Sequence, residues 1–417
     1  MKYILRYSIF LVPVLAILLS CNKEIIISDD NIILEFSIDT VMFDTVFTEI
    51  GSTTKRFTVK NPEQGTIIIN KIKLVGGNQS NFRMNVNGIN DNSVSDVEIR
   101  ANDSIFIFVE VTVDPNDATT PMVIEDSIIF QINDNIQDVN LVAFGQDYFL
   151  INADYLATQT WTAEKPYLIY NYMVVDSAKT LTIKEGCQLH FHHQASLYVL
   201  GTLIVEGTVE EPVVFQGDRL EYMYRDVPGQ WGYIHLLSGS HDNVIDHAII
   251  KNAIIGLQVD TFFNSSPTLI LSNTKIENMN AVGLYAQGAK IQASNCVFGN
   301  CGQYSAALAI GGDYQFYHCT FGNYWSYSNR VTPSLIINNY YEDVNENINV
   351  RPIENAYFAN CIIYGNRDNE IGLDKYEYSQ QSTFNYRFES CLLKTDTVLP
   401  VDRQINCIVN HNPAFVD

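Results

Sequence analysis

The sequence predicts an all-β protein in which a β-sandwich is followed by a right-handed parallel β-helix solenoid. Three observations carry this prediction. Short runs of Val, Ile, Phe and Thr, separated by Asn, Asp, Gly and Pro, fill residues 31–147 without a helical period. A pattern of about 22 to 27 residues then repeats from residue 248 to residue 319, which is typical of a solenoid. The apolar residues, 47% of the chain, are too abundant for a disordered protein.

The first residues have the composition of a secretory signal. Basic side chains precede an apolar run over residues 7–19, which a proline interrupts and which is too short for a membrane span. The phrase LLSC at residues 18–21 resembles the lipobox of bacterial lipoproteins, in which the cysteine is acylated and becomes the mature N-terminus. The resemblance implies lipidation of Cys21, with residues 1–21 as signal peptide and lipobox. The alternative is an ordinary signal peptide with an incidental cysteine.

The residues after Cys21 indicate the location of the protein, and the net charge indicates which class of partner is not expected. Asn22, in place of Asp, resembles the sorting signal of outer-membrane lipoproteins, and SDD at residues 28–30 resembles surface-export tags of Bacteroidetes lipoproteins. The resemblance implies a lipid anchor in the outer membrane, on its periplasmic or cell-surface face. With 47 acidic against 25 basic residues, the net charge of −22 repels phosphate backbones, so nucleic acid is not expected as a partner.

Residues 22–148 are expected to form the β-sandwich. Strand-like runs such as RFTVKNP and DSIIFQINDN alternate there with turn signals. No cysteine lies between residues 22 and 186, so the domain lacks the inter-sheet disulfide of antibody domains. The stretch FDTVFTEIGSTTKRFTVKNP, with the later FVEVTVDP, resembles immunoglobulin-like modules of the Hydin and ASPM type. That resemblance implies a spacer or interaction module.

Residues 149–417 are expected to form the solenoid, because similar residues recur at fixed positions of each repeat. One predicted column is Ala248, Thr274, Cys296, Cys319, Cys361 and Cys391. Two apolar columns are Ile250, Ile276, Phe298, Phe321, Ile363 and Leu393, and Ile245, Leu271, Ala293, Phe316, Phe358 and Phe388. A further strand aligns Leu257, Leu284, Leu308, Leu335 and Leu373. Turn positions that favour the left-handed region are assigned to Asn252, Asn278, Asn300, Asn323 and Asn366.

This part of the chain resembles the pectin-lyase-like superfamily of right-handed β-helices. The stretches LTIKEGCQLHFHHQASLYVLGTLIVEGTVEEPVVFQGD and GDRLEYMYRDVPGQWGYI closely resemble Bacteroidetes β-helix lipoproteins. The wide gap between Cys319 and Cys361 is expected to hold a loop insertion around NYYEDVNENINVRP. The final phrase NHNPAFVD precedes a closing segment in similar proteins, so the solenoid is expected to be truncated or to be capped by a partner.

The spacing of the cysteines and histidines predicts neither a metal site nor a cofactor site. The stacked cysteines are expected to fill the core, because their Cβ atoms point in parallel, and a disulfide between Cys296 and Cys319 is the alternative. The chain has no CxxC motif, and HFHH at residues 190–193 is its only histidine cluster. His190 and His192 share the outer face without a third ligand, so no metal and no cofactor is predicted.

Candidate ligand-binding residues lie in the phrase GDRLEYMYRD, and they are Asp218, Arg219, Glu221 and Arg225. Arginines among acids and beside aromatic rings suit sugar binding or catalysis, and the alternative is a structural loop with paired charges. On the outer side of the aligned leucine strand only Asp260 and Asp374 are acidic. They lie four repeats apart, about 19 Å, too far for the carboxylate pair of a hydrolase, so no catalytic residue is predicted.

The sequence therefore favours a lipid-anchored envelope protein whose solenoid is a non-catalytic binding or adhesion scaffold for glycans or envelope proteins. The alternative is a polysaccharide lyase or glycoside hydrolase of pectin-lyase-like fold, with its active site in the loops. An enzyme is expected to show carboxylates, or a carboxylate and an arginine, converging in a cleft. A binding protein needs only aromatic rings and amides.

Overall fold

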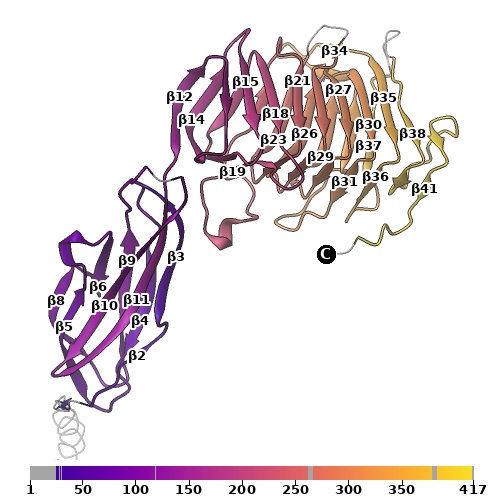
Figure 1. Ribbon diagram of the computed structural model, residues 1–417. Coiled ribbons are helices and arrows are strands. Elements are labelled where there is room, and N and C mark those ends of the chain that lie inside the picture. The colour runs from indigo at the N-terminus through magenta and orange to yellow at the C-terminus, as the bar shows by residue number, and fades with distance from the viewer. Residues whose placement is uncertain are drawn as a thin grey trace, which may run out of the picture. The chain divides into compact units, whose positions relative to one another are not determined.

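The computed structural model describes residues 25–27, 29, 31–117, 119–261, 266–377 and 383–415. The chain divides into two compact units, Met1–Gln146 and Asp147–Asp417 (Figure 1). The described regular structure is almost entirely β, with two short 3-10 turns, η1 (Gly77–Gln79) and η2 (Tyr222–Tyr224). No helix in the described part of the chain is long and apolar enough to cross a membrane. Cys21, the predicted lipidation site, lies outside the described residues.

The first unit consists of two β-sheets that share one apolar core. One sheet has the order β1-β5-β10-β11-β3, with β8 paired to β5. Its strands are β1 (Ile26–Ile27), β3 (Thr40–Phe47), β5 (Thr66–Leu74), β8 (Ser93–Ile99), β10 (Met122–Ile132) and β11 (Asn135–Gln146). The other sheet has the order β2-β4-β9-β6-β7. Its strands are β2 (Glu35–Phe36), β4 (Lys55–Lys60), β6 (Phe82–Val86), β7 (Ile89–Asn90) and β9 (Ser104–Val111).

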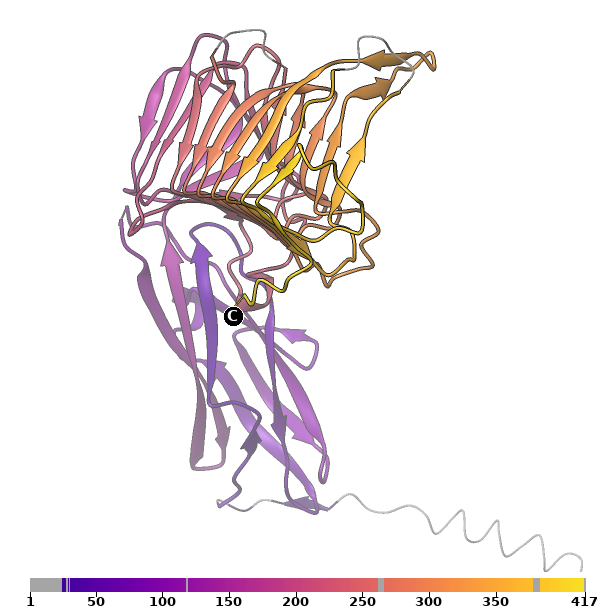
Figure 2. The same cartoon turned by 90° about the vertical axis from the view of Figure 1, so that its right-hand side faces the viewer.

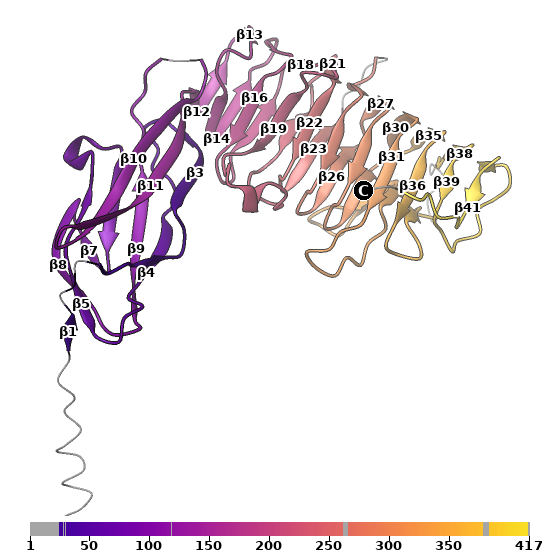
Figure 3. The ribbon, with the colours of Figure 1, turned by 60° about the horizontal axis from the view of Figure 1, so that its bottom comes forward.

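The second unit is built from coils of parallel strands. We call its three sides the first, second and third faces, in the order in which the chain visits them. The first face contains β13 (Gln159–Trp161), β15 (Thr180–Lys184), β18 (Thr202–Glu206), β21 (Asn243–Asp246), β24 (Leu269–Ser272), β27 (Lys290–Ser294), β30 (Gly312–Tyr317), β35 (Ile353–Ala359), β38 (Arg387–Glu389) and β40 (Gln404–Ile405). In each face, successive strands lie side by side along the solenoid (Figure 1, Figure 3).

The second and third faces alternate in one long sheet. The second face contains β16 (Gln188–Phe191), β19 (Val213–Gly217), β22 (Ala248–Lys251), β25 (Lys275–Glu277), β28 (Val297–Gly299), β31 (Thr320–Asn323), β36 (Ile362–Gly365), β39 (Leu392–Leu393) and β41 (Ile408–Val409). The third contains β17 (Ser196–Val199), β20 (Ile234–Leu236), β23 (Ile255–Asp260), β26 (Val282–Gln287), β29 (Tyr304–Ala309), β32 (Leu335–Asn338) and β37 (Ile371–Asp374). The opening strand β14 (Tyr167–Val175) spans both faces and pairs with β12 (Phe149–Leu156).

Long parallel sheets of this kind are those of a β-helix solenoid, as predicted. Each strand pairs in parallel with its counterpart in the next coil, for example β23 with β26 and β25 with β28. The insertion predicted after Cys319 contains an antiparallel hairpin, β33 (Tyr340–Glu342) and β34 (Ile348–Val350), which lies between β32 and β35 in the chain. The hairpin projects from the edge of the stacked coils (Figure 2).

The strand register confirms both predicted apolar columns. The column from Ile250 to Leu393 is in register at every step. The column from Ile245 to Phe388 is also in register throughout. Aromatic rings stack within these columns, and the centroids of Phe298 and Phe321 are 4.9 Å apart. One continuous core therefore runs through the solenoid.

The predicted leucine column is wrong after its first step. Leu257 opposes Leu284 as predicted. Leu284, however, opposes Ala306 rather than Leu308. Leu308 then opposes Ile337 rather than Leu335, and Leu335 opposes Ile371 rather than Leu373. A shift of two residues leaves a side chain on the same face, so the inward direction was predicted correctly although the register was not. The third-face strands have several apolar inward positions, and apolar character alone cannot choose between them.

The predicted cysteine column is buried, and it continues for one more coil to Cys407, which is partly exposed. Its members are free thiols, so they fill the core rather than form a disulfide. The backbone N–H groups of Cys319, Cys361 and Cys391 each donate to the Sγ of the next cysteine along the column, at 3.4 Å. Each Sγ in turn donates to a backbone carbonyl, such as Tyr317 O at 3.3 Å from the Sγ of Cys319.

The predicted left-handed asparagines are confirmed in part. Asn252, Asn278 and Asn300 have positive φ angles of 67°, 59° and 52°, whereas the predicted Asn323 and Asn366 do not adopt this conformation. A second left-handed column, which the sequence analysis missed, lies one residue before the cysteine column. Its members are His247, Asn273, Asn295, His318, Asn360, Ser390 and Asn406. These residues allow the sharp turn from the first face to the second.

Candidate functional site

The outer side of the third face carries a band of polar and aromatic side chains, which we call the third-face strip. In β23, Leu257 and Val259 are fully buried in the core, so Gln258 and Asp260 point outward. The same alternation in neighbouring strands aligns the members of the strip, which are Tyr198, Tyr233, His235, Gln258, Asp260, Tyr285, Gln287, Asn338 and Asp374.

One part of the strip is a histidine–aspartate pair beside two tyrosines. The Nε2 of His235 lies 2.9 Å from Oδ2 of Asp260. The rings of Tyr198 and Tyr233 lie 6.2 and 5.8 Å from that of His235, and their hydroxyls are 3.0 Å apart. The hydrogen bond with Tyr198, together with burial, raises the pKa of Tyr233 to about 12. Tyr233 therefore remains neutral at physiological pH, and the two tyrosines offer hydroxyl groups for hydrogen bonds.

Amides connect this pair to the next coil. The Nε2 of Gln258 donates to Oδ1 of Asp260 and to Oε1 of Gln287, both at 3.3 Å. The Nε2 of Gln287 donates to the hydroxyl of Tyr285 at 2.8 Å. The side chains thus hold one another in place across adjacent strands. A fixed row of amides and hydroxyls is the chemistry that binds the hydroxyls of a sugar.

The far part of the strip is arranged around Asp374. Its carboxylate accepts hydrogen bonds from Asn338 Nδ2 at 3.0 Å and from the hydroxyl of Tyr340 at 3.2 Å. The rings of Tyr340 and Tyr376 lie 5.5 Å apart. As predicted, Asp260 and Asp374 belong to strands four coils apart, about 19 Å at the spacing of parallel strands. The two carboxylates cannot act on one glycosidic bond.

A cleft of about 290 Å³ opens at the corner where the third face turns toward the first. Consecutive coils and the β33–β34 hairpin supply its lining residues, which are Ser238, Asp260, Thr261, Gln287, Ile310, Tyr341 and Arg351. The cleft shares Asp260 and Gln287 with the third-face strip, so the two form one continuous site. It brings a carboxylate and an arginine to one cavity, although no ion pair joins Asp260 and Arg351 in the described structure.

The backbone at this cleft is strained. Ile310 has a φ of 61°, which a β-branched residue rarely adopts. Its N–H donates to Oδ1 of Asn338 at 3.4 Å, and the N–H of Gly311 donates to the backbone oxygen of Asn338 at 3.2 Å. Strain of this kind is retained most often at functional sites. The strained backbone at Ile310 is therefore an indication of a functional site at the cleft that does not depend on the side chains that line it.

The predicted ligand-binding residues lie elsewhere, in the loop that follows β19, and they are largely paired with one another. Arg219 binds Glu221 through its Nε and Nη2 atoms at 3.1 to 3.3 Å, and its guanidinium stacks over Tyr224 at 3.9 Å from the ring centroid. Arg225 pairs with Asp226 at 3.3 Å. Such pairing is what the alternative prediction, a structural loop with paired charges, describes.

The fourth predicted residue, Asp218, contacts one of the predicted outer-face histidines. Its Oδ2 lies 2.6 Å from Nδ1 of His192, whose ring stacks on Tyr170 at 4.3 Å. Leu189 and Phe191 are fully buried in the core, so His190 between them points to the outer side of β16 as expected. It is nevertheless only 5% exposed, with Nδ1 3.3 Å from the oxygen of Gly217. Within the described ranges, no group of three or more His, Cys, Asp or Glu side chains is arranged to hold a metal ion.

The loop itself is fixed by hydrogen bonds from the solenoid. The Nε2 of Gln230 donates to the oxygens of Tyr224 and Val227 at 2.6 and 2.8 Å. Asn252 Nδ2 donates to the oxygen of Arg225 at 2.8 Å. The tip of the loop nevertheless exposes large side chains, since Tyr222 is 79% exposed. The four residues therefore belong to a loop that hydrogen bonds hold against the solenoid.

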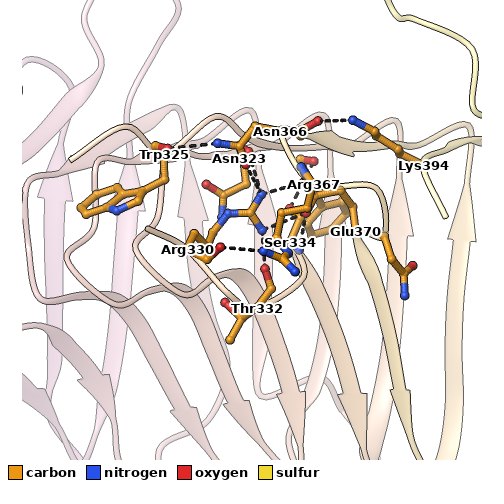
Figure 4. Close-up of polar contacts among 12 residues, drawn as sticks. Asn323, Trp325, Arg330, Thr332, Ser334, Asn366, Arg367, Glu370 and Lys394 are labelled. Atoms are coloured by element: carbon orange, nitrogen blue, oxygen red, sulfur yellow. Dashed lines mark hydrogen bonds and ion pairs between the residues drawn. The ribbon is translucent and has the colours of Figure 1, made fainter. Parts of the chain in front are cut away.

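A buried ion pair fixes a second loop at the corner between the second and third faces (Figure 4). The guanidinium of Arg330 contacts both carboxylate oxygens of Glu370, at 2.6 and 2.9 Å. Arg330 also donates to Oδ1 of Asn366 at 2.7 Å, and Glu370 accepts from the backbone of Ser334 at 2.8 Å. The pair is inaccessible to ligands. It stabilises the loop beside the third-face strip.

Sequence reasoning missed Arg351, Tyr341 and Thr261. The stretch that contains Arg351 and Tyr341 was predicted only as a loop insertion, and an insertion has no counterpart in other repeats that would place its side chains. Thr261 follows directly after the aligned strand and carries no distinguishing signal. Of the residues that line the cleft, Asp260 is the one that strand alternation predicts as an outward carboxylate.

Comparison with known proteins adds little to this geometry. No protein-family model matches the chain, and no curated protein is similar to it. A solved family 123 glycoside hydrolase from Clostridium perfringens, described for glycolipid glycan hydrolysis, is similar with a TM-score of 0.21 and 7% identity over 29% of this chain. The match spans 26% of the length of that hydrolase. A likeness this low carries no argument about the activity of this protein.

Proposed function

We propose that the protein is a lipid-anchored envelope protein whose right-handed β-helix binds a glycan along the third-face strip. In this proposal Cys21 anchors the chain in the outer membrane, and the first unit is an immunoglobulin-like spacer. The glycan lies across the coils, from the tyrosines near His235 to Asp374, and enters the cleft under the hairpin.

The row of hydrogen-bonding and aromatic side chains on β20, β23 and β26 carries this proposal. Amide, hydroxyl and carboxylate groups of successive coils are connected to one another, from His235 and Asp260 through Gln258 to Gln287 and Tyr285. Ordered polar groups lose little conformational entropy on binding, and tyrosine rings stack on sugars. A row of this kind suits a chain of sugar units better than a single small ligand.

Binding without turnover is favoured by the state of the carboxylates. Both oxygens of Asp260 are occupied, one by His235 and the other by Gln258. Asp374 is likewise bound by Asn338 and Tyr340. A carboxylate with satisfied oxygens orients its neighbours and is poorly placed to take a proton from a substrate.

One observation favours polysaccharide lyase activity as a second candidate function. Asp260 and Arg351 line the same cleft, and a histidine lies 2.9 Å from the carboxylate. An arginine that neutralises an acidic sugar, beside a histidine that accepts a proton, would provide the parts of a lyase. Binding and turnover are therefore to be measured on the same samples.

The experiment is a glycan screen with the protein that begins at Asn22, in which binding and release of new sugar ends are recorded together. The variants Tyr285→Ala and Gln258→Ala remove an aromatic ring and an amide from the strip. Each is expected to weaken binding by roughly tenfold, while Tyr222→Ala in the loop after β19 leaves binding unchanged. Loss of binding in the loop variant alone would overturn the proposed site. New sugar ends that carry an unsaturated uronate, detected by ultraviolet absorbance, would establish the lyase.

A further inference from the structure

We propose that the cleft recognises an anionic group on the bound glycan, a carboxylate or a sulfate ester, and that Arg351 binds it. This inference rests on the proposed function and specifies the class of glycan. It depends on the position of one arginine, on its contacts, and on the fact that no carboxylate of the described residues pairs with it.

Among the residues that the structure describes, Arg351 has no acidic partner. Its Nη1 donates to Oγ1 of Thr261 at 3.1 Å, and its guanidinium lies 5.8 Å from the centre of the Tyr341 ring. No carboxylate of the described residues forms an ion pair with it. In the same unit, carboxylates pair with Arg219, Arg225, Arg330, Arg387 and Arg403. An unpaired cation in a chain of net charge −22 is available to an anionic ligand.

The guanidinium is held in position before any ligand binds. The backbone N–H of Arg351 donates to the oxygen of Asn339 at 2.8 Å. The Thr261 hydroxyl that accepts from Arg351 itself donates to the oxygen of Gln287 at 2.6 Å. The planar arginine fork is therefore oriented by the hairpin on one side and by the solenoid corner on the other. Orientation of this kind favours bidentate binding of a planar or tetrahedral anion.

Two glycines leave room for this arrangement. A Cβ atom at Gly288 would lie 2.7 Å from Thr261 Oγ1 and 3.4 Å from Arg351 Nη1. A Cβ atom at Gly311 would lie 2.8 Å from the Cβ of Arg351. Both glycines have positive φ angles, 68° and 83°. A side chain at either position would displace the arginine or its partner.

The other residues that line the cleft suit the neutral part of a sugar. Thr261 and Ser238 offer hydroxyls, and Tyr341 offers a ring on which a sugar can stack. The carboxylate of Asp260 is bound by His235 and Gln258, so it does not compete for Arg351. The cleft thus combines one cation with hydroxyl, amide and aromatic groups, which is the composition expected for an acidic sugar unit.

The test is a glycan array with neutral, carboxylated and sulfated members, read with wild type, Arg351→Gln and Arg351→Lys. Arg387→Gln serves as the matched control, because it removes the same charge from a surface pair. Dextran, carboxymethyl dextran and dextran sulfate are added to compare the two anions on one backbone. Thermal unfolding of each variant confirms that it is folded.

We expect anionic glycans to bind and Arg351→Gln to weaken that binding by roughly tenfold to a hundredfold. Arg351→Lys should give an intermediate loss and Arg387→Gln none, and added salt should weaken binding to the wild type. Neutral glycans that bind regardless of Arg351, or anionic glycans that bind Arg351→Gln equally well, would overturn this inference and leave the proposed function intact. Absence of binding to every glycan would overturn both.

Discussion

Arg330 and Glu370 form an ion pair between neighbouring coils, with Nη2 and Oε1 2.6 Å apart and side-chain exposures of 1% and 0%. Arg330 also donates to the backbone oxygen of Thr332 and to Oδ1 of Asn366, and the backbone N–H of Ser334 donates to Glu370 (Figure 4). Taking two charges out of water is costly, and these additional hydrogen bonds offset part of that cost.

Removal of one partner should therefore destabilise the solenoid strongly. Glu370→Gln leaves the guanidinium of Arg330 buried without a counter-charge, and we expect a loss of about 3–5 kcal/mol in the free energy of unfolding. The surface variant Arg387→Gln should cost less than about 1 kcal/mol. All three tryptophans of the chain lie in the solenoid, so tryptophan fluorescence in a denaturant titration reports on this unit. Equal losses in the two variants would contradict the role of the buried pair.

The buried His190 should make the solenoid less stable in acid. Burial lowers its pKa from 6.5 to about 4, so between these values the unfolded chain binds a proton that the folded chain does not. The contribution of neutral His190 to the free energy of unfolding is then fully present above pH 6.5. It falls by roughly 3 kcal/mol as the pH approaches 4. His190→Gln cannot titrate and should lose less stability in this range. Parallel curves for the two proteins would show that His190 does not contribute.

The cysteines should differ sharply in reactivity. Cys407 is partly exposed, whereas the other thiols of the protein that begins at Asn22 are buried. Burial also raises the pKa of Cys187 to about 11 and that of Cys301 to about 12, so neither forms the reactive thiolate at neutral pH. Treatment of the folded protein with N-ethylmaleimide should label Cys407 first, as measured by peptide mass spectrometry. Rapid labelling of Cys187 or a disulfide-linked peptide pair would contradict the packed core of free thiols.

Membrane attachment should depend on Cys21. We expect Cys21→Ser to abolish incorporation of labelled fatty acid and to move the protein from the membrane fraction to the soluble fraction. Cys407→Ser is the matched control, because it removes a thiol far along the chain and should leave the protein in the membrane fraction. Retention of Cys21→Ser in the membrane would show that the anchor lies elsewhere.

The solenoid could be predicted because its core repeats. Each coil places apolar side chains at the same positions, so Phe298, Phe321 and their counterparts could be aligned from the sequence alone. The register failed only where several apolar inward positions compete, as at Ala306 and Leu308. A shift of two residues leaves a side chain on the same face of the strand. The apolar pattern therefore predicts which side chains point inward better than it predicts which residues of neighbouring strands pair.

The candidate site could be predicted only in part, because its loops do not repeat. The outward direction of Asp260 followed from strand alternation. Arg351 belongs to an insertion, and only the path of the hairpin brings it to the cleft. Arg219 and Glu221 were predicted as ligand-binding residues because of their charges, yet these two side chains bind each other. Sequence proximity of opposite charges indicates pairing at least as often as it indicates a site.

The most direct test of the account is hydrogen–deuterium exchange of the protein with and without a bound glycan. We predict slower exchange in β23, β26 and β29 and in the hairpin that precedes Arg351, with no change in the loop that carries Arg219 and Glu221. Protection confined to that loop, or to the first unit, would contradict the assignment of the third-face strip as the glycan-binding surface.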